Sequence, residues 1–242
     1  MYQECAKLYD TPMRDQFSRQ CAKLCRKVFQ GRSIRPPAAV SDLGCGTGLL
    51  CKLLQDDGFT LTGVDLSEQM LDIARGREYN SQPEFLLHDI RTFRRREAFQ
   101  AVLCFGDVLN HLLETSDLEE LFTSACFSLS PGGVFIADTT SREAYLSGLW
   151  DVEGLVEERE GLDVSVSGSF DAETNLGTIE VTASGVEGTV TETVWQRYHP
   201  DDLVGRLLKE AGFSTVICQK FNPIPGLSEL EAIKFIWLAI KG

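Results

Sequence analysis

Residues 40–50 of the chain read VSDLGCGTGLL, in which three glycines stand at every second position after an acidic residue. The glycines are Gly44, Gly46 and Gly48, and the acid is Asp42. Glycine lets the backbone reach positive φ and lets a ligand approach without meeting a Cβ. A turn of this composition between a strand and a helix is typical of a nucleotide-binding site in an open parallel sheet.

Further acidic residues follow apolar segments that are typical of strands. Asp65 comes after FTLTGV, 21 positions beyond Gly44, while Asp89 follows EFLLH and Asp107 follows AVLCFG. Because the carboxyl ends of parallel strands share one edge of a sheet, we expect these carboxylates at one cleft. The carboxylate of Asp65 is suited to accept hydrogen bonds from ribose hydroxyls. A cleft with several carboxylates favours a cationic ligand over a pyrophosphate.

NAD is the alternative ligand for such a turn. Its fingerprint is G-x-G-x-x-G/A, which places a helix N-terminus at the pyrophosphate. Counted from Gly44, the third glycine of that fingerprint belongs at position 49, whereas the chain has Gly48 followed by Leu49. The spacing therefore disfavours an NAD oxidoreductase, which we keep as a distant alternative.

The segments around these residues alternate between strand-like and helix-like patterns. Ser67 is expected to cap one helix, and Ser116 with Asp117 another that runs to about Leu129. Strands that alternate with helices of about ten to fifteen residues predict a parallel sheet with crossover helices. The expected strands are 38–43, 59–65, 84–88, 98–105 and 134–138, and a late helix, 200–211, precedes two more strands, 213–220 and 232–240.

The pattern changes near residue 152. Four segments with period-two alternation, separated by turn residues, predict an inserted antiparallel meander; they are 153–159, 162–170, 177–184 and 189–198. We therefore divide the chain into an N-terminal helical segment, a core and an insertion, which are 1–37, 38–151 with 199–242, and 152–198. The helical segment is either a lid or a packed helix, and the insertion is either a substrate cap or a sheet that packs, for example as a homodimer contact.

Composition excludes several classes of partner. The net charge of −13 opposes a protein whose affinity comes from nucleic-acid phosphates, so we read the basic run at Arg91 and 94–96 as a solvated segment. The apolar tract 232–240 is too short for a membrane span and is interrupted by Lys234. None of the eight cysteines forms a C-x-x-C pair. We expect buried free thiols, a cytoplasmic location and no metal, with a soft-metal site as the alternative.

Taken together, the motifs resemble those of the class I S-adenosylmethionine-dependent methyltransferase family. DLGCGTG resembles the first family motif, GVDLSEQML the second, LLHDIR the third, AVLCFGDVLNHL the fourth, and LSPGGVFIAD the turn before the fifth strand. The resemblance is to the small-molecule branch, in which a Tyr-Asp pair (here Tyr9-Asp10) precedes the core and antiparallel strands are inserted after the fifth strand. It implies an α/β fold with a Rossmann-like, doubly wound, seven-stranded and mostly parallel sheet plus the antiparallel β-meander.

The resemblance also implies a cofactor and a reaction. The cofactor is S-adenosyl-L-methionine, the product S-adenosyl-L-homocysteine, and the reaction an in-line methyl transfer to an O or N of a small soluble acceptor. Asp65 would hold the ribose and Asp89 the adenine amino group. The full set of implied cofactor residues is Tyr9, Asp42, Gly44, Cys45, Gly46, Gly48, Asp65, Leu66, Met70, Asp89, Ile90, Phe105, Gly106 and Asp107.

Candidates for the chemical step are few. His111 and His199 are the candidate general bases, and each is alternatively a satisfied structural histidine beside a helix start. Trp195, Arg197 and Tyr198 end the last meander segment and are candidate substrate contacts or sheet-packing residues. A domain that binds the cofactor or a partner protein without turnover is the second functional hypothesis.

Overall fold

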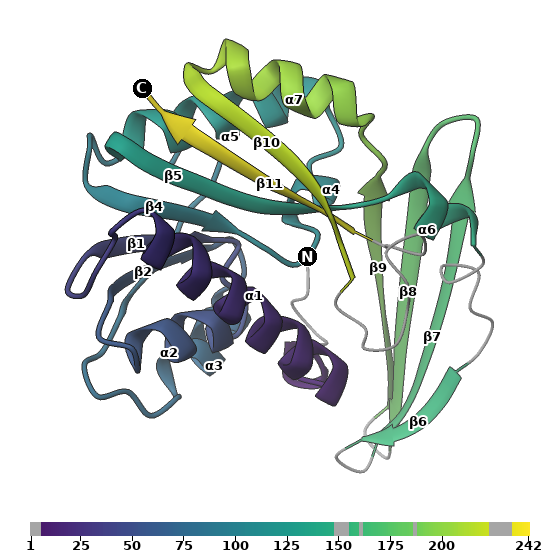
Figure 1. Cartoon of the computed structure of the whole chain (residues 1–242). Helices are drawn as coiled ribbons and strands as arrows, with labels where there is room; N and C mark the ends of the chain where they lie inside the picture. Colours follow the sequence, from purple (N-terminus) through teal and green to yellow (C-terminus); the bar gives the residue numbers. More distant parts are fainter. Residues whose placement is uncertain (1–5, 148–154, 160–161, 186–187, 223–233) are drawn as a thin grey trace.

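The computed structural model describes residues 6–147, 155–159, 162–185, 188–222 and 234–242, which form two sheets (Figure 1). The strands of the larger sheet are β1 (Ala39–Leu43), β2 (Thr60–Asp65), β3 (Glu84–Leu87), β4 (Phe99–Cys104), β5 (Leu129–Thr140), β10 (Phe213–Phe221) and β11 (Lys234–Lys241). Their order is β10-β11-β5-β4-β1-β2-β3. The first five strands pair in parallel, whereas β11 is antiparallel to both β5 and β10. The predicted mostly parallel, seven-stranded, doubly wound sheet is confirmed.

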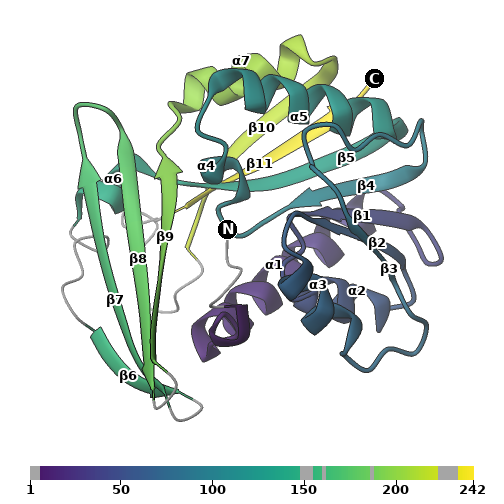
Figure 2. The same ribbon diagram turned by 180° about the vertical axis from the view of Figure 1, so that it is seen from behind.

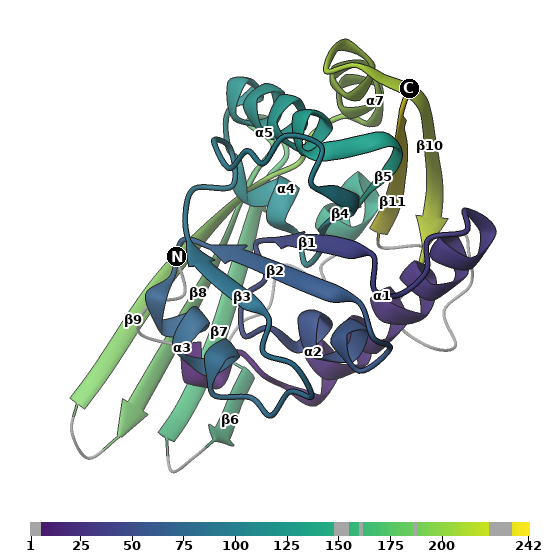
Figure 3. The same cartoon turned by 90° about the vertical axis from the view of Figure 1, so that its left-hand side faces the viewer.

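Helices cover both faces of this sheet (Figures 1 and 3). One face carries α1 (Pro12–Gly31), α2 (Leu49–Gln55) and α3 (Glu68–Arg75), and the other carries α5 (Thr115–Ser128) and α7 (Asp201–Glu210). Strand β4 shows why two layers are needed. Its residues Ala101 and Leu103 pack with Cys21 and Leu50 of α1 and α2 in one buried cluster. Alternate side chains point to opposite faces of a strand, so the residues between them belong to a second cluster beneath α5 and α7.

Helices α1 and α3 begin after residues whose side chains cap the first helical turn. Thr11 accepts a hydrogen bond from the Arg14 amide at 3.1 Å, and Pro12 occupies the first helical position of α1. Ser67 accepts from the Met70 amide at 3.3 Å, which confirms the predicted cap of α3. A short 3-10 helix, η1 (Ala6–Leu8), precedes α1.

The second sheet is the predicted antiparallel meander. Its strands, in the spatial order β6-β7-β8-β9, are β6 (Leu155–Arg159), β7 (Leu162–Asp171), β8 (Leu176–Gly185) and β9 (Gly188–Arg197). It stands beside the parallel sheet, near the end where β5 leads into α6 (Arg142–Leu146) (Figure 2). Leu8 of η1 packs against Val164 and Ala183 on one side of it. The opposite side carries hydroxyl pairs such as Thr182 with Thr191 at 2.9 Å.

Several predicted boundaries were wrong. Helix α5 begins at Thr115 with Glu114 as its N-cap, rather than after a cap at Ser116 and Asp117. Strand β5 begins at Leu129 instead of residue 134, because Leu129 already pairs with Phe99 before the Pro-Gly-Gly turn. Helix α6 and the four-residue helix α4 (Val108–His111) were not predicted, since they are too short to show a helical repeat.

Two expected strands begin outside the described residues, namely the first meander segment at 153 and the last strand at 232. Within the described chain, all seven cysteines are free thiols and six of them are buried. No described helix combines the length and apolar character that a membrane crossing requires.

Candidate functional site

A cavity of about 500 Å³ opens at the carboxyl ends of β1, β2 and β4, beside α4. This volume is typical of small-molecule sites. The structure brings nine of the predicted cofactor residues into its wall, together with the candidate base His111. These nine residues are Tyr9, Gly44, Gly46, Asp65, Leu66, Met70, Asp89, Ile90 and Gly106.

The three glycines of the turn have different surroundings, although each has positive φ. A Cβ on Gly44 would lie 2.5 Å from the Val108 side chain, and one on Gly48 would lie 2.8 Å from Ala74 of α3. A Cβ on Gly46 would have no heavy atom nearer than 3.9 Å, where the Tyr9 ring lies. Gly46 therefore leaves space for a ligand, whereas Gly48, predicted as a cofactor contact, permits close packing between α2 and α3.

Asp65 ties the glycine turn to α3. Its two carboxylate oxygens accept hydrogen bonds from the Gly46 amide at 2.8 Å and the Ser67 amide at 2.9 Å. Burial raises the pKa of Asp65, which these amide donors oppose. Because each carboxylate oxygen has two lone pairs, the carboxylate can still accept a hydrogen bond from a ligand.

Asp89 is held by Arg91, the first arginine of the basic run. The Arg91 guanidinium donates to both oxygens of Asp89 at 2.6–3.1 Å and to Asp117 at 2.6 Å. It keeps the pKa of Asp89 below its usual value. Arg91 lies in a loop, as expected for this basic run, and its partly exposed side chain also bridges two carboxylates in the cavity wall. Asp117, 26 positions away, gave no local signal.

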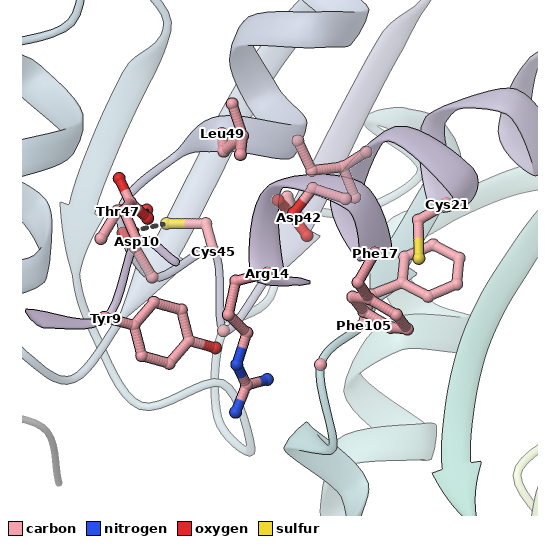
Figure 4. Close-up of a pocket in the computed structure, with 15 residues that line it drawn as sticks. Tyr9, Asp10, Arg14, Phe17, Cys21, Asp42, Cys45, Thr47, Leu49 and Phe105 are labelled. Carbon is pink, nitrogen blue, oxygen red and sulfur yellow. Dashed lines mark hydrogen bonds between the residues drawn. The ribbon is translucent and has the colours of Figure 1, made fainter. Parts of the chain in front are cut away.

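A smaller cavity of about 50 Å³ lies beneath α1 (Figure 4). Three further predicted cofactor residues, Asp42, Cys45 and Phe105, line it together with Arg14 and Phe17 of the N-terminal helix. The Cys51 thiol donates to Asp42 at 3.5 Å. Burial raises the pKa of Asp42 to about 7. Asp42 is therefore an unusually basic carboxylate at the closed end of the site.

The segment before α1 is fastened to the glycine turn. The Thr47 hydroxyl donates to Asp10 at 2.6 Å, and Arg77 donates both to Asp10 and to the Thr47 carbonyl oxygen. The next residue back, Tyr9, lies between the two cavities and lines both. The Arg14 guanidinium lies 4.8 Å from the centre of its ring. Asp10 and Arg77 thus hold Tyr9 beside the candidate site.

Asp107, another predicted cofactor contact, lies in a buried ionic cluster behind the cavity. The Lys234 ammonium donates to Asp107 and, at 2.7 Å, to Asp138 of β5, whose carboxylate also accepts from the Gly106 amide at 2.7 Å. Although burial opposes ionisation, Lys234 lowers the pKa of Asp107 below its usual value. The cluster holds the turn that follows β4. Lys234 was missed because it was read only as an interruption of an apolar tract.

The two candidate histidines have different environments. His111 lines the large cavity, and its Nδ1 lies 3.1 Å from the carbonyl oxygen of Trp195. Burial lowers the pKa of His111 to about 4. His199 is 2% exposed, and its Nε2 lies 2.8 Å from the Leu112 carbonyl oxygen. Burial lowers the pKa of His199 as well. This geometry favours His111 as the base and a structural part for His199, whose catalytic role stays a prediction.

The three candidate substrate contacts point elsewhere. The side chain of Trp195 is 49% exposed on the face of β9 opposite to buried Val194 and Gln196. Arg197 donates to the Thr174 carbonyl oxygen at 2.9 Å, and the Tyr198 ring packs edge-on against Tyr145. At this end of β9, the peptide carbonyl of Trp195, rather than its ring, meets the cavity residue His111.

Comparison with known proteins finds similarity to methyltransferases over about half of the chain. A family model described as a methyltransferase domain matches residues 40–133. The chain is 35% identical over 143 residues to a putative methyltransferase, YqeM, of Bacillus subtilis (strain 168), which covers 58% of this chain and 56% of that protein. It is 33% identical over 141 residues to the dTDP-3-amino-3,6-dideoxy-alpha-D-glucopyranose N,N-dimethyltransferase of Streptomyces fradiae. That match covers 56% of this chain and 52% of that protein. The matches thus span about half the length of these relatives.

Solved structures resemble the chain along most of its length. A S-adenosylmethionine-dependent methyltransferase from Clostridium acetobutylicum ATCC 824 superposes with a TM-score of 0.76 at 19% identity, covering 96% of this chain and 93% of that one. The structure of Streptomyces venezuelae DesVI superposes with a TM-score of 0.74 at 20% identity, covering 94% of this chain and 93% of that one. At these identities the likeness establishes the fold. The family model adds that residues 40–133 match a methyltransferase domain.

Proposed function

We propose that this protein is an S-adenosylmethionine-dependent methyltransferase that methylates an O or N atom of a small soluble acceptor. The observation that carries the proposal is the composition of the 500 Å³ cavity. A glycine with open space, Gly46, faces it next to the carboxylate of Asp65, and apolar side chains follow at the ends of β2 and β3. This is the set of groups that a nucleoside requires.

The residues present fit the cofactor. Asp65 would accept hydrogen bonds from the ribose hydroxyls, and Leu66 with Ile90 would enclose the adenine. Leu66 is 61% exposed, so a planar base at the cavity mouth would cover apolar surface that now faces water. The methionine end would point toward the smaller cavity. There the guanidinium of Arg14 would pair with its carboxylate and Asp42 would lie near its ammonium group.

The charge of the site supports a sulfonium nucleoside over NAD. The guanidinium of Arg91 in the cavity wall is already neutralised by Asp89 and Asp117. The carboxylates of Asp65 and Glu114 line the same cavity. A pyrophosphate would therefore meet net negative charge, whereas a cationic ligand would be attracted.

The reaction requires mainly alignment. S-adenosylmethionine, when bound, supplies an activated methyl group on a sulfonium sulfur. Holding an acceptor in line with that group is worth roughly 7–11 kcal/mol in favourable cases. His111 would accept the acceptor's proton. Because its Nδ1 faces a carbonyl oxygen and its pKa is about 4, its Nε2 is an unprotonated acceptor at neutral pH.

The acceptor is proposed to be a small molecule that enters beside His111, with the insertion as its cap. The relative from Streptomyces fradiae is a dTDP-3-amino-3,6-dideoxy-alpha-D-glucopyranose N,N-dimethyltransferase. A nucleotide-linked amino sugar is therefore the first acceptor to test. The net charge of −13 supports exclusion of nucleic acids as acceptors. A cytoplasmic location and a homodimer stay predictions.

The proposal is tested by incubating the protein with methyl-labelled S-adenosylmethionine and a panel of amino sugars, amines and hydroxyl compounds. We expect S-adenosylhomocysteine in equimolar amount with one labelled product. A His111→Asn variant should retain cofactor binding while its turnover falls about 100-fold, the lower end of the usual contribution of a general base. Cofactor binding without turnover on any acceptor would instead favour the non-catalytic binding module.

A further inference from the structure

A chain of buried polar side chains connects the antiparallel insertion to His111. The Tyr145 hydroxyl on α6 donates to Gln196 Oε1 on β9 at 3.0 Å, and each side chain belongs to a residue only 1% exposed. The other end of the same carboxamide, Gln196 Nε2, lies 3.4 Å from His111 Nε2. The opposite ring nitrogen of His111 contacts the Trp195 carbonyl oxygen at 3.1 Å.

One main-chain carbonyl fixes the direction of every bond in this chain. The Trp195 oxygen can only accept, so Nδ1 of His111 carries the hydrogen. In a neutral imidazole the other nitrogen, Nε2, is then an acceptor. Gln196 must therefore present its amide NH₂ group to Nε2 and its oxygen to Tyr145, and this is the arrangement in which Tyr145 donates.

The same pair of residues can also serve the protonated ring. When Nε2 gains a proton it becomes a donor and needs an oxygen opposite. A half-turn of the Gln196 carboxamide, which keeps the shape of the group, supplies that oxygen. The NH₂ group then faces Tyr145, whose hydroxyl both donates and accepts. The 3.4 Å bond of the neutral state is longer than the usual 2.7–3.2 Å, so it is the bond that an N–H or O–H group of the methyl acceptor would displace.

We propose that Gln196 and Tyr145 are positioning residues that orient His111 and reverse their hydrogen bonds when it takes a proton. This inference rests on the proposed function of the site. As the acceptor atom bonds to the methyl carbon, the carbon–sulfur electron pair leaves with sulfur and the acceptor's proton passes to Nε2 of His111. Gln196 and Tyr145 then satisfy the imidazolium until solvent removes that proton.

Charged groups on three other elements also act on His111. Asp107, before α4, favours the imidazolium, whereas Arg14 of α1 and Lys234 of β11 oppose it. These charges and burial set the average proton affinity of the ring. Gln196 differs from these charged groups because its side chain contacts Nε2 directly. The orientation of its carboxamide depends on whether Nε2 is protonated.

The first test uses nitrogen NMR on the unaltered protein, which has only three histidines. We expect His111 to carry its hydrogen on Nδ1 at pH 7. In Gln196→Met, the imidazolium loses a charge-assisted hydrogen bond while the neutral ring loses only a long one, so the pKa of His111 should fall. In Gln196→Glu, a carboxylate beside Nε2 should raise that pKa.

The second test measures turnover and cofactor affinity. Gln196→Met and Tyr145→Phe should each lower kcat about tenfold, an effect of the size expected for one buried polar group left unpaired. The dissociation constant of S-adenosylmethionine should stay unchanged. Gln196→Glu should introduce an acid limb into the pH profile of kcat/KM. Gln55→Met is the matched control, because Gln55 is a buried glutamine at the far end of α2 that bonds the Asn80 amide.

The results of the two tests distinguish failure of the hydrogen-bond chain from failure of the proposed function. Hydrogen on Nε2 in the unaltered protein would overturn the inference without any variant having to fold. So would a kcat for Tyr145→Phe and Gln196→Met equal to that of Gln55→Met. If the tautomer and the pKa shifts are as expected but no acceptor is methylated by the unaltered protein, the hydrogen-bond chain is supported and the proposed function fails.

Discussion

At the scale of single residues, the chemistry of this chain depends on a few buried acids with different partners. Asp65 is fixed by two backbone amides, and Asp89 is paired with Arg91. Asp42 differs from both because its polar partner is the thiol of Cys51. The same residue type therefore provides a proposed hydrogen-bond acceptor for a nucleoside, an ion-pair partner and a carboxylate with a raised pKa.

The raised pKa of Asp42 predicts a pH-dependent stability. Its pKa is about 7 in the folded protein against an ordinary value of 3.8, so the folded state binds the proton more tightly. This contribution is fully present below pH 3.8 and is lost as the pH rises to about 7, at up to about 1.4 kcal/mol per pH unit. We expect Asp42→Asn, in which nothing ionises, to gain stability relative to the unaltered protein across that window.

Denaturant unfolding of both proteins between pH 4 and pH 8 measures this difference. Asp163→Asn, on the exposed side of β7, is the matched control for the replacement of an aspartate by asparagine. If Asp42→Asn followed the unaltered protein in parallel across the window, the carboxylate would be ionised throughout and the assignment would be wrong.

At the scale of elements, the late antiparallel strand β11 is joined to the centre of the site through Lys234. Its ammonium is buried between Asp107 and Asp138, and Phe17 of α1 covers it at 5.2 Å. The cluster therefore connects α1, the turn after β4, β5 and β11. Removal of the cation would leave two buried carboxylates without this counter-charge.

We expect Lys234→Met to lower the free energy of unfolding by about 3–5 kcal/mol, because an uncompensated buried charge is costly. The triple variant Lys234→Met, Asp107→Asn, Asp138→Asn removes the charges together and should recover most of that loss. Lys241→Met on the same strand, which loses a bond to the Leu129 carbonyl oxygen, should cost about 1 kcal/mol. A triple variant less stable than Lys234→Met would contradict a primarily ionic role for the cluster.

The segment before α1 is a second element whose position depends on few contacts. Asp10 joins it to Thr47 and Arg77 at the glycine turn. Because this ion pair is partly exposed, we expect Asp10→Ala to change stability by at most about 1 kcal/mol. Release of Tyr9 should instead speed cofactor dissociation several-fold, which stopped-flow fluorescence can measure. Asp15→Ala, in the exposed pair with Arg19, should leave the dissociation rate unchanged, and equal rates in all three proteins would exclude the fastening role.

The sequence predicted the parts of the site that are local. Ser67 caps α3, and Asp65 ends its strand beside the glycine turn, because these features depend on neighbours a few positions away. The long-range contacts gave no such signal. Lys234 and Asp107 are 127 positions apart, and His111 and the Trp195 carbonyl are 84 apart. Asp107 was consequently assigned to the cofactor, and the side chain of Trp195 to the substrate, from their position in the strand pattern alone.

At the scale of the whole molecule, the two sheets position different parts of the candidate site. The doubly wound sheet places the glycine turn, Asp65 and Asp89 at one edge, and the meander adds β9 beside α4 at that edge. His111 lies where the two meet. The solved methyltransferase structures superpose over more than nine-tenths of this chain, so the meander belongs to the shared fold. Its proposed part is to shape the acceptor side of the cavity.

The central claim is that the cavity binds S-adenosylmethionine, and isothermal titration calorimetry tests it most directly. We expect the unaltered protein to bind S-adenosylmethionine and S-adenosylhomocysteine with a Kd below about 100 µM, within the usual range for enzyme ligands. Asp65→Ala should weaken both at least about tenfold through loss of charge-assisted hydrogen bonds to the ribose. NAD should give no heat. Absence of binding by the folded, unaltered protein at high micromolar S-adenosylmethionine, or saturable binding of NAD in its place, would contradict the account.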